Sequence, residues 1–332
     1  MSVLRRMMMD GFNIDAIPSS RKIYYTASEK ITPKENSLGS KVMVNMYDAT
    51  TMNGVIVTES DIITIEKGVF NFYRNLTSVI IPDSVTSIGE SAFDDCSSLT
   101  SITIPDSVTS IGHYAFRSCN SLESIYIPSN VNSVGIYTFN NCANLKEFKR
   151  TTETEPKYLL IVNNTVVAYA PKGIKENGIL TIPDNVTSIG NQAFNHCTNL
   201  TSVNIPDNVT EIGFNAFDHC QKLTSVTIGN GVTSIGSNAF QFCQKLTSVT
   251  IGNGVTTIGK SAFYNCSSLT SVYCKATTPP TLDSSTVFES NGSGRKIYVP
   301  AGSVDAYKNA TNWSEYADAI IGYDFENNTV IE

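Results

Sequence analysis

Hydrophobic positions recur in this chain with a fixed period. Successive cysteines within a run, such as Cys96 and Cys119, are 23 positions apart. Phenylalanine stands three positions before each cysteine of the pattern, and leucine stands three positions after it. The cysteines are Cys96, Cys119, Cys142, Cys197, Cys220, Cys243 and Cys266. A degenerate copy with Phe70, Tyr73 and Leu76 precedes them. A fixed period of this length predicts a solenoid of stacked coils.

The coil from Leu99 to Cys119 reads LTSITIPDSVTSIGHYAFRSC. Ile102 and Ile104 alternate with Thr103, as a strand with one buried face requires. Pro105 follows and cannot donate a ladder hydrogen bond, so it ends the strand. The coil therefore predicts one short strand that neighbouring coils extend into a parallel sheet.

The second half of the coil predicts the opposite side of the solenoid. Gly112 recurs in every copy, and we expect it to adopt a backbone conformation that a Cβ would penalise. Residues 115–119 fit one short helical or 3₁₀ turn with Phe116 and Cys119 on its buried side. The predicted fold class is a β-rich leucine-rich-repeat solenoid with a parallel concave sheet, short 3₁₀ or helical turns, and terminal caps.

The period also divides the chain. The spacing between Cys142 and Cys197 is 55 residues, one period of 23 plus a longer stretch of 32. We predict five segments. They are an N-terminal leader and cap (1–57), a first repeat block (58–149), a hairpin insertion (150–181), a second repeat block (182–273), and a C-terminal cap and tail (274–332).

The insertion contains KYLLIVNNTVVAYA, two β-branched runs around Asn163 and Asn164. Asparagine tolerates positive φ, so this pair predicts a two-residue hairpin turn. The insertion is either neutral to the array or a protruding element beside a binding face, and both interpretations stay open.

Solenoid ends need caps because they expose an open core and an unpaired strand. Near the C-terminus we predict a strand over 296–299, a short helix from the N-cap Ser303 to Lys308, and a wedge made by Trp313. Strand-like runs at 23–26 and 42–46 predict the N-terminal cap.

Composition limits the function. Hydrophobic residues make up 41% and charged residues 16%, which excludes a disordered acidic chain. The net charge is −7, with Lys+Arg 23 against Asp+Glu 30, so a nucleic-acid partner is not expected. No apolar run is long enough for a bilayer, and membrane insertion is not expected. Arg5 and Arg6 are followed by too few apolar residues for a conventional signal peptide.

Candidate chemistry is sparse, and we predict neither an enzyme nor a cofactor or metal site. The cysteines occupy equivalent slots and point the same way, which predicts buried free thiols rather than disulfides or zinc ligands. His196 and His219 are predicted to stack at the surface; two imidazoles could hold a metal weakly, but no third ligand is apparent. Phosphate-loop, nucleophile-elbow and zinc-protease motifs are absent from the sequence.

The outward strand positions form the candidate binding face. One column is mainly serine, from Ser78 to Ser271, and the other carries larger groups. Tyrosine suits contact surfaces because it is amphipathic and costs little to order. The candidate ligand-binding residues are Thr103, Tyr126, Lys149, Asn204, Thr227, Thr250 and Tyr273.

The string I-P-D-S/N-V-T-S-I-G-x-x-A-F-x-x-C-x-x-L-T-S resembles the BspA-like leucine-rich repeat family, over roughly residues 58–149 and 177–274. The last copies depart from it, because Gly229 and Gly252 replace proline, and Gly231 and Gly254 follow. We expect this change to loosen the turn. The segment 296–320 is similar to the end of such proteins from gut Bacteroidetes and their phages.

The resemblance implies a non-catalytic scaffold for recognition or adhesion. We expect a monomer that binds a protein or glycan over the sheet face, at the cell surface or on a phage particle. The alternative is a structural or spacer component of a phage virion or bacterial surface assembly. Ice binding by the Ser/Thr rows is a third, weaker hypothesis, because the bulky residues interrupt those rows.

Overall fold

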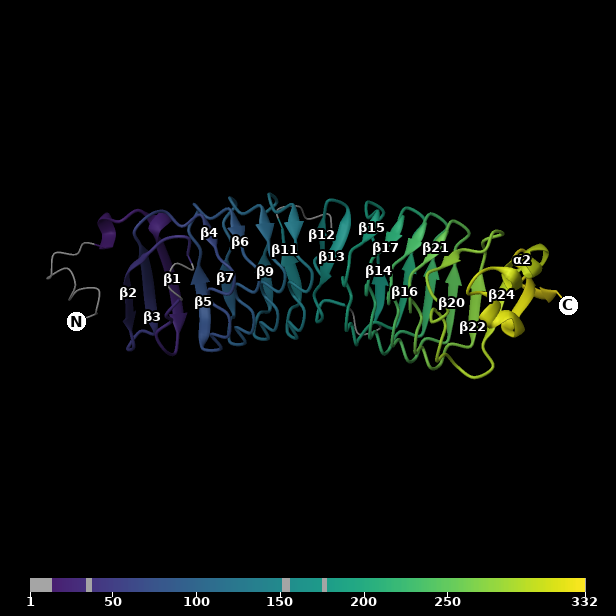
Figure 1. The fold of residues 1–332 in the computed structure, drawn as a ribbon. Helices are drawn as coiled ribbons and strands as arrows, with labels where there is room; N and C mark the ends of the chain where they lie inside the picture. The colour runs from purple at the N-terminus through teal and green to yellow at the C-terminus, as the bar shows by residue number, and fades with distance from the viewer. Residues whose placement is uncertain (1–13, 34–37, 151–155, 175–177, 332) are drawn as a thin grey trace. The chain divides into compact units, whose positions relative to one another are not determined.

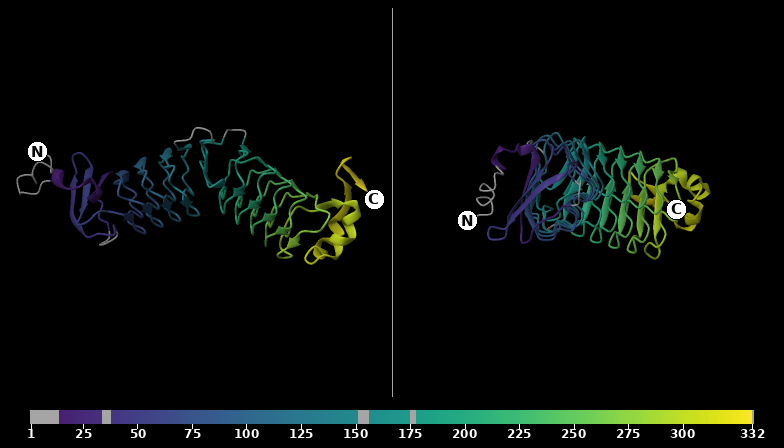
Figure 2. Two further views of the ribbon diagram at one scale, coloured as in Figure 1. Left: turned by 90° about the horizontal axis from the view of Figure 1, so that it is seen from above. Right: turned by 60° about the vertical axis from the view of Figure 1, so that its left-hand side comes forward.

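The computed structural model describes residues 14–33, 38–150, 156–174 and 178–331 (Figure 1). The segment that bears on an export signal lies outside these ranges. Contacts divide the chain into two compact units. Unit 1 is Met1–Val162 with Ala170–Gly173, and unit 2 is Asn163–Tyr169 with Ile174–Glu332. Within each unit the chain winds into stacked coils (Figure 2), which confirms the predicted solenoid.

Unit 1 begins with an antiparallel element and continues as parallel coils. Strand β1 pairs with β3 on one side and with β5 on the other, both antiparallel, so it covers the edge of the first coil. The strand-like runs predicted near the N-terminus are the strands β1 and β2. The elements are η2 (Ile14–Ala16), η3 (Ser19–Arg21), β1 (Lys22–Ala27), β2 (Val42–Asp48) and β3 (Asn53–Thr58).

The coils of unit 1 contribute one strand to each of two sides. Pairing is parallel between successive coils, with Ser78 opposite Ser101 on the first side and Ser87 opposite Ser110 on the second. The first side has β5 (Leu76–Ile80), β7 (Ser101–Thr103), β9 (Ser124–Tyr126) and β11 (Glu147–Lys149). The second side has β4 (Thr64–Ile65), β6 (Ser87–Ile88), β8 (Ser110–Ile111) and β10 (Ser133–Val134), and β12 (Leu159–Val162) closes the unit.

Unit 2 repeats this arrangement with longer strands. An eight-stranded sheet runs β14-β16-β18-β20-β22-β24-β25-β26 and forms its first side. Its strands are β14 (Ile179–Thr181), β16 (Ser202–Ile205), β18 (Ser225–Ile228), β20 (Ser248–Ile251), β22 (Ser271–Cys274), β24 (Lys296–Pro300), β25 (Ile320–Asp324) and β26 (Thr329–Ile331). The second side has β13 (Thr165–Tyr169), β15 (Ser188–Ile189), β17 (Glu211–Ile212), β19 (Ser234–Ile235), β21 (Thr257–Ile258) and β23 (Thr281–Leu282).

Part of the insertion belongs to the array of unit 2. Asn163 and Asn164 form the predicted turn before β13, with φ of 50° and 59°. Strand β13 then pairs in parallel with β15, and the ring of Tyr169 lies 5.6 Å from that of Phe194. This tyrosine therefore takes the place of a repeat phenylalanine.

Phenylalanines form one continuous file in the core of each unit. In unit 1 the rings of Phe93 and Phe116 are stacked with centroids 5.3 Å apart. In unit 2 the rings of Phe217 and Phe240 are stacked with centroids 5.0 Å apart. These spacings are close to the separation of neighbouring strands, about 4.8 Å, because each coil adds one strand and one ring. No coil buries its apolar side alone, so each depends on its neighbours.

The turns opposite the first side are not 3₁₀ or helical, and this part of the prediction is wrong. Each coil places two residues at positive φ, as Tyr114 and Ser118 do at 57° and 58°, and a helical turn cannot contain them. The reason is hydrogen bonding between coils. The amides of Ser91, Phe93 and Asp95 each donate to a carbonyl of the next coil at 2.8 Å, which offsets the cost of the left-handed residues.

The recurring glycine is needed, but the reason is not the backbone conformation that we expected. Gly112 does not have positive φ; instead, a Cβ there would lie 2.6 Å from the backbone nitrogen of Glu90 in the preceding coil. The later glycines also lie close to the neighbouring coil. A Cβ at Gly231 would lie 1.7 Å from the carbonyl oxygen of Asp207. Glycine is required in both places because adjacent coils approach too closely for a side chain.

The C-terminal cap follows the predicted order, with η4 (Ala301–Ser303), α2 (Val304–Asn309) and η5 (Ser314–Ala319). Trp313 is fully buried, and its Nε1 donates to the carbonyl of Pro280 at 2.7 Å. It packs edge-on against Tyr307, so it is part of the core and not a ligand-stacking residue. Ser303 stands at the N-cap position as predicted, but its side chain makes no capping hydrogen bond.

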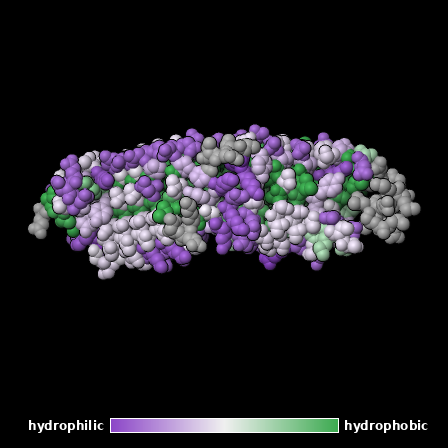
Figure 3. Space-filling model, turned by 180° about the vertical axis from the view of Figure 1, so that it is seen from behind, coloured by the Kyte–Doolittle hydropathy of each residue, from purple (hydrophilic) through white to green (hydrophobic). Residues whose placement is uncertain are grey.

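Hydrophilic residues dominate the surface seen from behind, and hydrophobic ones appear in separate patches between them (Figure 3). Within the described residues, no helix has the length and apolar character needed to cross a bilayer.

Candidate functional site

The thiols of the core are candidate reactive groups, and their burial keeps them away from solvent and reagents. All eight cysteines are free and buried, as the sequence predicts. Each thiol in the interior of the array contacts the preceding coil; Cys142 Sγ donates to the carbonyl of Phe116 at 3.0 Å. Burial raises the pKa of Cys142 to about 12. A thiol that is protonated and inaccessible is a poor nucleophile and a poor metal ligand.

The histidine pair stacks as predicted, with the rings of His196 and His219 4.5 Å apart. Nδ1 of His219 lies 2.7 Å from a carboxylate oxygen of Asp218. Parallel stacked imidazoles direct their lone pairs side by side, so they do not converge on one ion. Among the described residues, no three His, Cys, Asp or Glu side chains form a cluster that could hold a metal.

The predicted binding residues lie on the first side of the coils, but in two sets. Thr103, Tyr126 and Lys149 belong to unit 1, and the other four belong to unit 2. Within each unit, backbone register aligns the residues. Lys149 lies opposite Tyr126, and Asn204 lies opposite Thr227.

In unit 1 the side chains of Tyr126 and Lys149 make polar contacts. The hydroxyl of Tyr126 donates to a carboxylate oxygen of Asp106 at 3.1 Å. Burial and this hydrogen bond raise the pKa of Tyr126. Nζ of Lys149 lies 3.7 Å from a carboxylate oxygen of Glu147 on the same strand.

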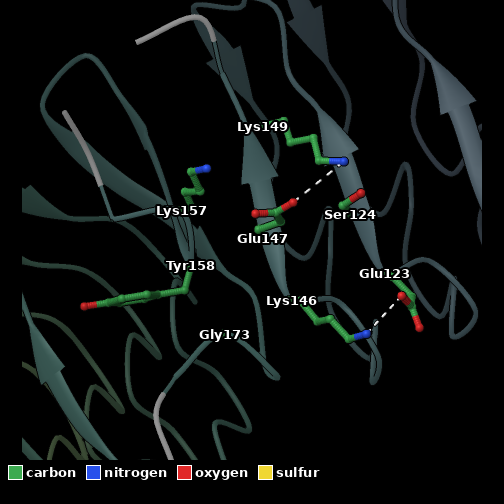
Figure 4. Close-up of a pocket in the computed structure, with 8 residues that line it drawn as sticks. All are labelled: Glu123, Ser124, Lys146, Glu147, Lys149, Lys157, Tyr158 and Gly173. Atoms are coloured by element: carbon green, nitrogen blue, oxygen red, sulfur yellow. Dashed lines mark hydrogen bonds and ion pairs between the residues drawn. The ribbon is translucent and has the colours of Figure 1, made fainter. Parts of the chain in front are cut away.

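Lys149 also lines a cavity of about 440 Å³ at the last coil of unit 1. A second ion pair, Lys146 with Glu123 at 2.9 Å, lies on the same wall. Figure 4 shows Lys157, Tyr158 and Gly173 on the facing segment, with the ring of Tyr158 pointing away from the ion pairs. One wall of the cavity is therefore charged, and Tyr158 lines the other side with its ring turned away from the ion pairs.

In unit 2 the outward residues of the sheet carry no charge over four strands. Strands β16, β18 and β20 have the sequences SVNI, SVTI and SVTI, and β22 has SVYC. Their second and fourth residues are buried. The outward residues are therefore serine, threonine, asparagine and one tyrosine.

That tyrosine begins an aromatic cluster, which we define as Tyr273, Tyr298, Tyr323 and Phe325. Tyr273 and Tyr298 are stacked with ring centroids 4.7 Å apart and planes inclined by 14°. Tyr323 meets Tyr273 edge-on at 5.4 Å, and Phe325 meets Tyr323 edge-on at 5.0 Å. All four side chains are half-buried, so their remaining surface faces solvent.

Sequence reasoning identified Tyr273 but missed the other three members of the cluster. Tyr298 lies opposite Tyr273, yet it is 25 residues later and therefore out of phase with the repeat of 23. The available signal was the segment KIYV, which has the same alternation as SVYC. It was predicted as a strand of the cap and was not assigned to the column.

These features define the class of the protein as a solenoid repeat scaffold. A family model described as the BspA type leucine rich repeat region, in six copies, matches residues 42–156 and 169–291. This chain belongs to the BspA-type leucine-rich repeat family. The family is one of leucine-rich repeat solenoids.

Two solved structures show the same architecture. One is a leucine rich cell surface protein from Faecalibacterium prausnitzii, 27% identical, with a TM-score of 0.57 over 73% of this chain and 62% of that protein. The other is the pneumococcal vaccine antigen PcpA, 19% identical, with a TM-score of 0.54 over 74% of this chain and 66% of that protein. The chain spans less than two thirds of the length of each. No curated protein matches it.

Proposed function

We propose that this protein is a non-catalytic recognition or adhesion scaffold that binds its partner over the first side of the coils. One observation carries the proposal. In unit 2 an uncharged column of small polar residues ends on the half-exposed aromatic cluster, and the column and the three tyrosines of the cluster stand on one continuous sheet. Aromatic side chains that are only partly covered are typical anchors of interfaces.

The rigidity of the sheet supports this function. Each outward residue is held by backbone pairing to the coils on both sides, as Thr227 is between Asn204 and Thr250. A surface that is already ordered loses little conformational freedom when it binds, so even modest contacts contribute to affinity. The partner class is a protein or a glycan. The relative from Faecalibacterium prausnitzii is a leucine rich cell surface protein, and this supports a place at the cell surface for the present chain.

A binding screen tests the proposal. Immobilised extracellular-matrix proteins and oligosaccharides are probed with the full chain by biolayer interferometry. The triple variant Tyr126→Ala, Lys149→Ala and Tyr273→Ala is expected to lose any affinity that the wild-type chain shows. The matched control is Thr109→Ala, Thr210→Ala and Thr256→Ala, because these exposed threonines precede strands on the second side. Equal binding by the two triple variants contradicts the proposal.

A second candidate function is a spacer in a virion or surface assembly. The observation in its favour is that many exposed hydroxyls already bond within the array. Thr224 Oγ1 donates to the carbonyl of Thr201 at 2.9 Å, and Thr247 Oγ1 repeats this bond to Thr224 at 3.0 Å. Hydroxyls that stiffen the stack serve a spacer as well as a binding face. Recovery of the protein with purified phage particles, and not with cell envelopes, would favour this alternative.

A further inference from the structure

The uncharged part of the sheet face of unit 2 differs from an ordinary protein surface. Eight consecutive outward positions on β16, β18, β20 and β22 contain no Asp, Glu, Lys or Arg. Six of the eight are serine or threonine, so the face offers hydroxyls that both donate and accept hydrogen bonds. They are Ser202, Asn204, Ser225, Thr227, Ser248, Thr250, Ser271 and Tyr273.

The ring of Tyr273, stacked on Tyr298, borders the uncharged row at one end. Its ring lies parallel to that of Tyr298, and the centroid distance of 4.7 Å matches the spacing of adjacent strands, about 4.8 Å. One side of the Tyr273 ring is therefore covered by Tyr298, and the other side is turned toward Thr250 on the next strand. Threonine is much shorter than tyrosine. The side of the ring that faces Thr250 thus rises above the row of hydroxyls.

We propose that this surface binds a neutral, extended, β-1,4-linked oligosaccharide that crosses the strands, with one terminal sugar ring against Tyr273. This inference rests on the proposed function and names its ligand class. The hydroxyls along the chain match the polar row, and the C–H bonds of the terminal sugar match the exposed side of the Tyr273 ring. The absence of charge along β16 to β22 favours a neutral ligand over one that carries a charge on every sugar, since Lys296, opposite Ser271 on β24, is among the described residues the one charged residue that pairs with this row.

The regular spacing of the strands supports a ligand that runs across them. Thr227 lies directly opposite Thr250, so equivalent hydroxyls repeat once per coil along the column. A sugar residue in an extended β-1,4 chain advances by nearly the same distance as one strand. Successive sugars therefore meet the same hydroxyl pattern on β16, β18 and β20, and the end of the chain reaches Tyr273.

Isothermal titration of the full chain tests the proposal with four hexasaccharide probes. Three are neutral and β-1,4-linked, made of glucose, mannose or xylose, and one is hexagalacturonate. We expect at least one neutral probe to bind more tightly than the acidic one. Thr227→Lys, which places a bulky charge in the middle of the row, and Tyr273→Ala are each expected to weaken binding by about tenfold or more, equivalent to about 1.4 kcal/mol.

The matched control is Thr233→Lys, because Thr233 is as exposed as Thr227 but precedes β19 on the second side. It is expected to bind like the wild type, and unchanged thermal unfolding of all three variants shows that they are folded. Tyr273→Phe keeps the stacked ring and is expected to retain most of the affinity.

Three outcomes overturn this inference. They are no binding of any neutral probe, tighter binding of hexagalacturonate, and equal affinity of wild type and Thr227→Lys. Its failure is distinguishable from failure of the proposed function. If no neutral probe binds but a protein partner binds wild type and not Thr227→Lys, the glycan is overturned and the recognition face is supported. If no sheet-face variant weakens the binding of either kind of ligand, both are overturned.

Discussion

Arg117 in unit 1 and Asp218 in unit 2 occupy the same position of the coil, directly after the core phenylalanine. Arg117 makes two hydrogen bonds, at 2.8 and 2.7 Å, to the buried Asp94 of the preceding coil. Asp218 instead accepts a bond of 3.2 Å from Asn195 of its preceding coil. One coil geometry therefore accommodates either an ion pair or an amide–carboxylate contact between neighbours.

The same contrast extends over the two surfaces. In the described part of the chain, every ion pair of a Lys or Arg with an Asp or Glu belongs to unit 1. In unit 2 the outward positions of β16 to β22 carry no charge, and the row ends at an aromatic cluster. The core determines the stacking and is shared, while the outward positions are free to differ. Recognition is expected to differ between the units for this reason.

The largest expected effect concerns the files of buried phenylalanines, which both units share. Phe116→Ala in unit 1 and Phe217→Ala in unit 2 each leave a cavity in a stacked file, and each is expected to lower the free energy of unfolding by about 3–5 kcal/mol. Urea denaturation measures the loss. Phe214→Ala is the control, because Phe214 is 40% exposed. A loss below about 1 kcal/mol for either core variant would mean that the two files are not equivalent.

Close approach of the coils gives the next effect. Gly112→Ala and Gly213→Ala are expected to destabilise by about 1–3 kcal/mol each, because the new Cβ would lie 2.6 and 2.7 Å from a backbone nitrogen of the preceding coil. Gly302→Ala, where a Cβ meets nothing within 4 Å, should change stability by less than about 0.5 kcal/mol. Unfolding midpoints of the three variants decide this, and a neutral Gly213→Ala would break the comparison.

The ion pair of unit 1 should contribute a smaller amount. A double-mutant cycle of Arg117→Ala and Asp94→Asn is expected to give a coupling of about 1 kcal/mol in urea unfolding. The value is modest because the Arg117 side chain is 39% exposed. High salt should reduce the coupling. A coupling near zero would show that the ion pair of unit 1 does not stabilise the fold.

The smallest effect concerns pH and unit 2. Burial, and then the neighbouring His219, lowers the pKa of His196 below its ordinary value. The unfolded chain then binds this proton more readily, so stability falls as the pH drops through about 6.5. Burial raises the pKa of Asp218, which acts in the opposite sense, because the folded chain then takes up that proton first.

The variant His196→Asn isolates this contribution. Asparagine suits the positive φ of this position, as Asn141 and Asn265 do in other coils. The variant is expected to lose less stability than the wild type between about pH 7.5 and about pH 5.5 in urea unfolding. An equal loss in both proteins would show that His196 does not contribute.

Much of the fold could be predicted because the coil is a local pattern. The spacing of Phe116, Cys119 and Leu122 is enough to place buried residues, and period-two alternation is enough to identify the outward column. The candidate site was predicted only in part. Tyr298 and Tyr323 join Tyr273 through pairing of β24 and β25. These strands lie beyond the last regular coil, so the 23-residue period does not show which of their residues align with Tyr273.

The amino-acid sequence by itself determined the coil, its buried file and the absence of charge from the outward positions of β16 to β22. Tertiary structure alone decided why Gly112 must lack a side chain, where the chain adopts positive φ, and which aromatic residues gather at the end of the sheet. The physical reason is that these features are contacts between coils. They arise only after the coils stack, and no single coil contains the atoms that approach one another.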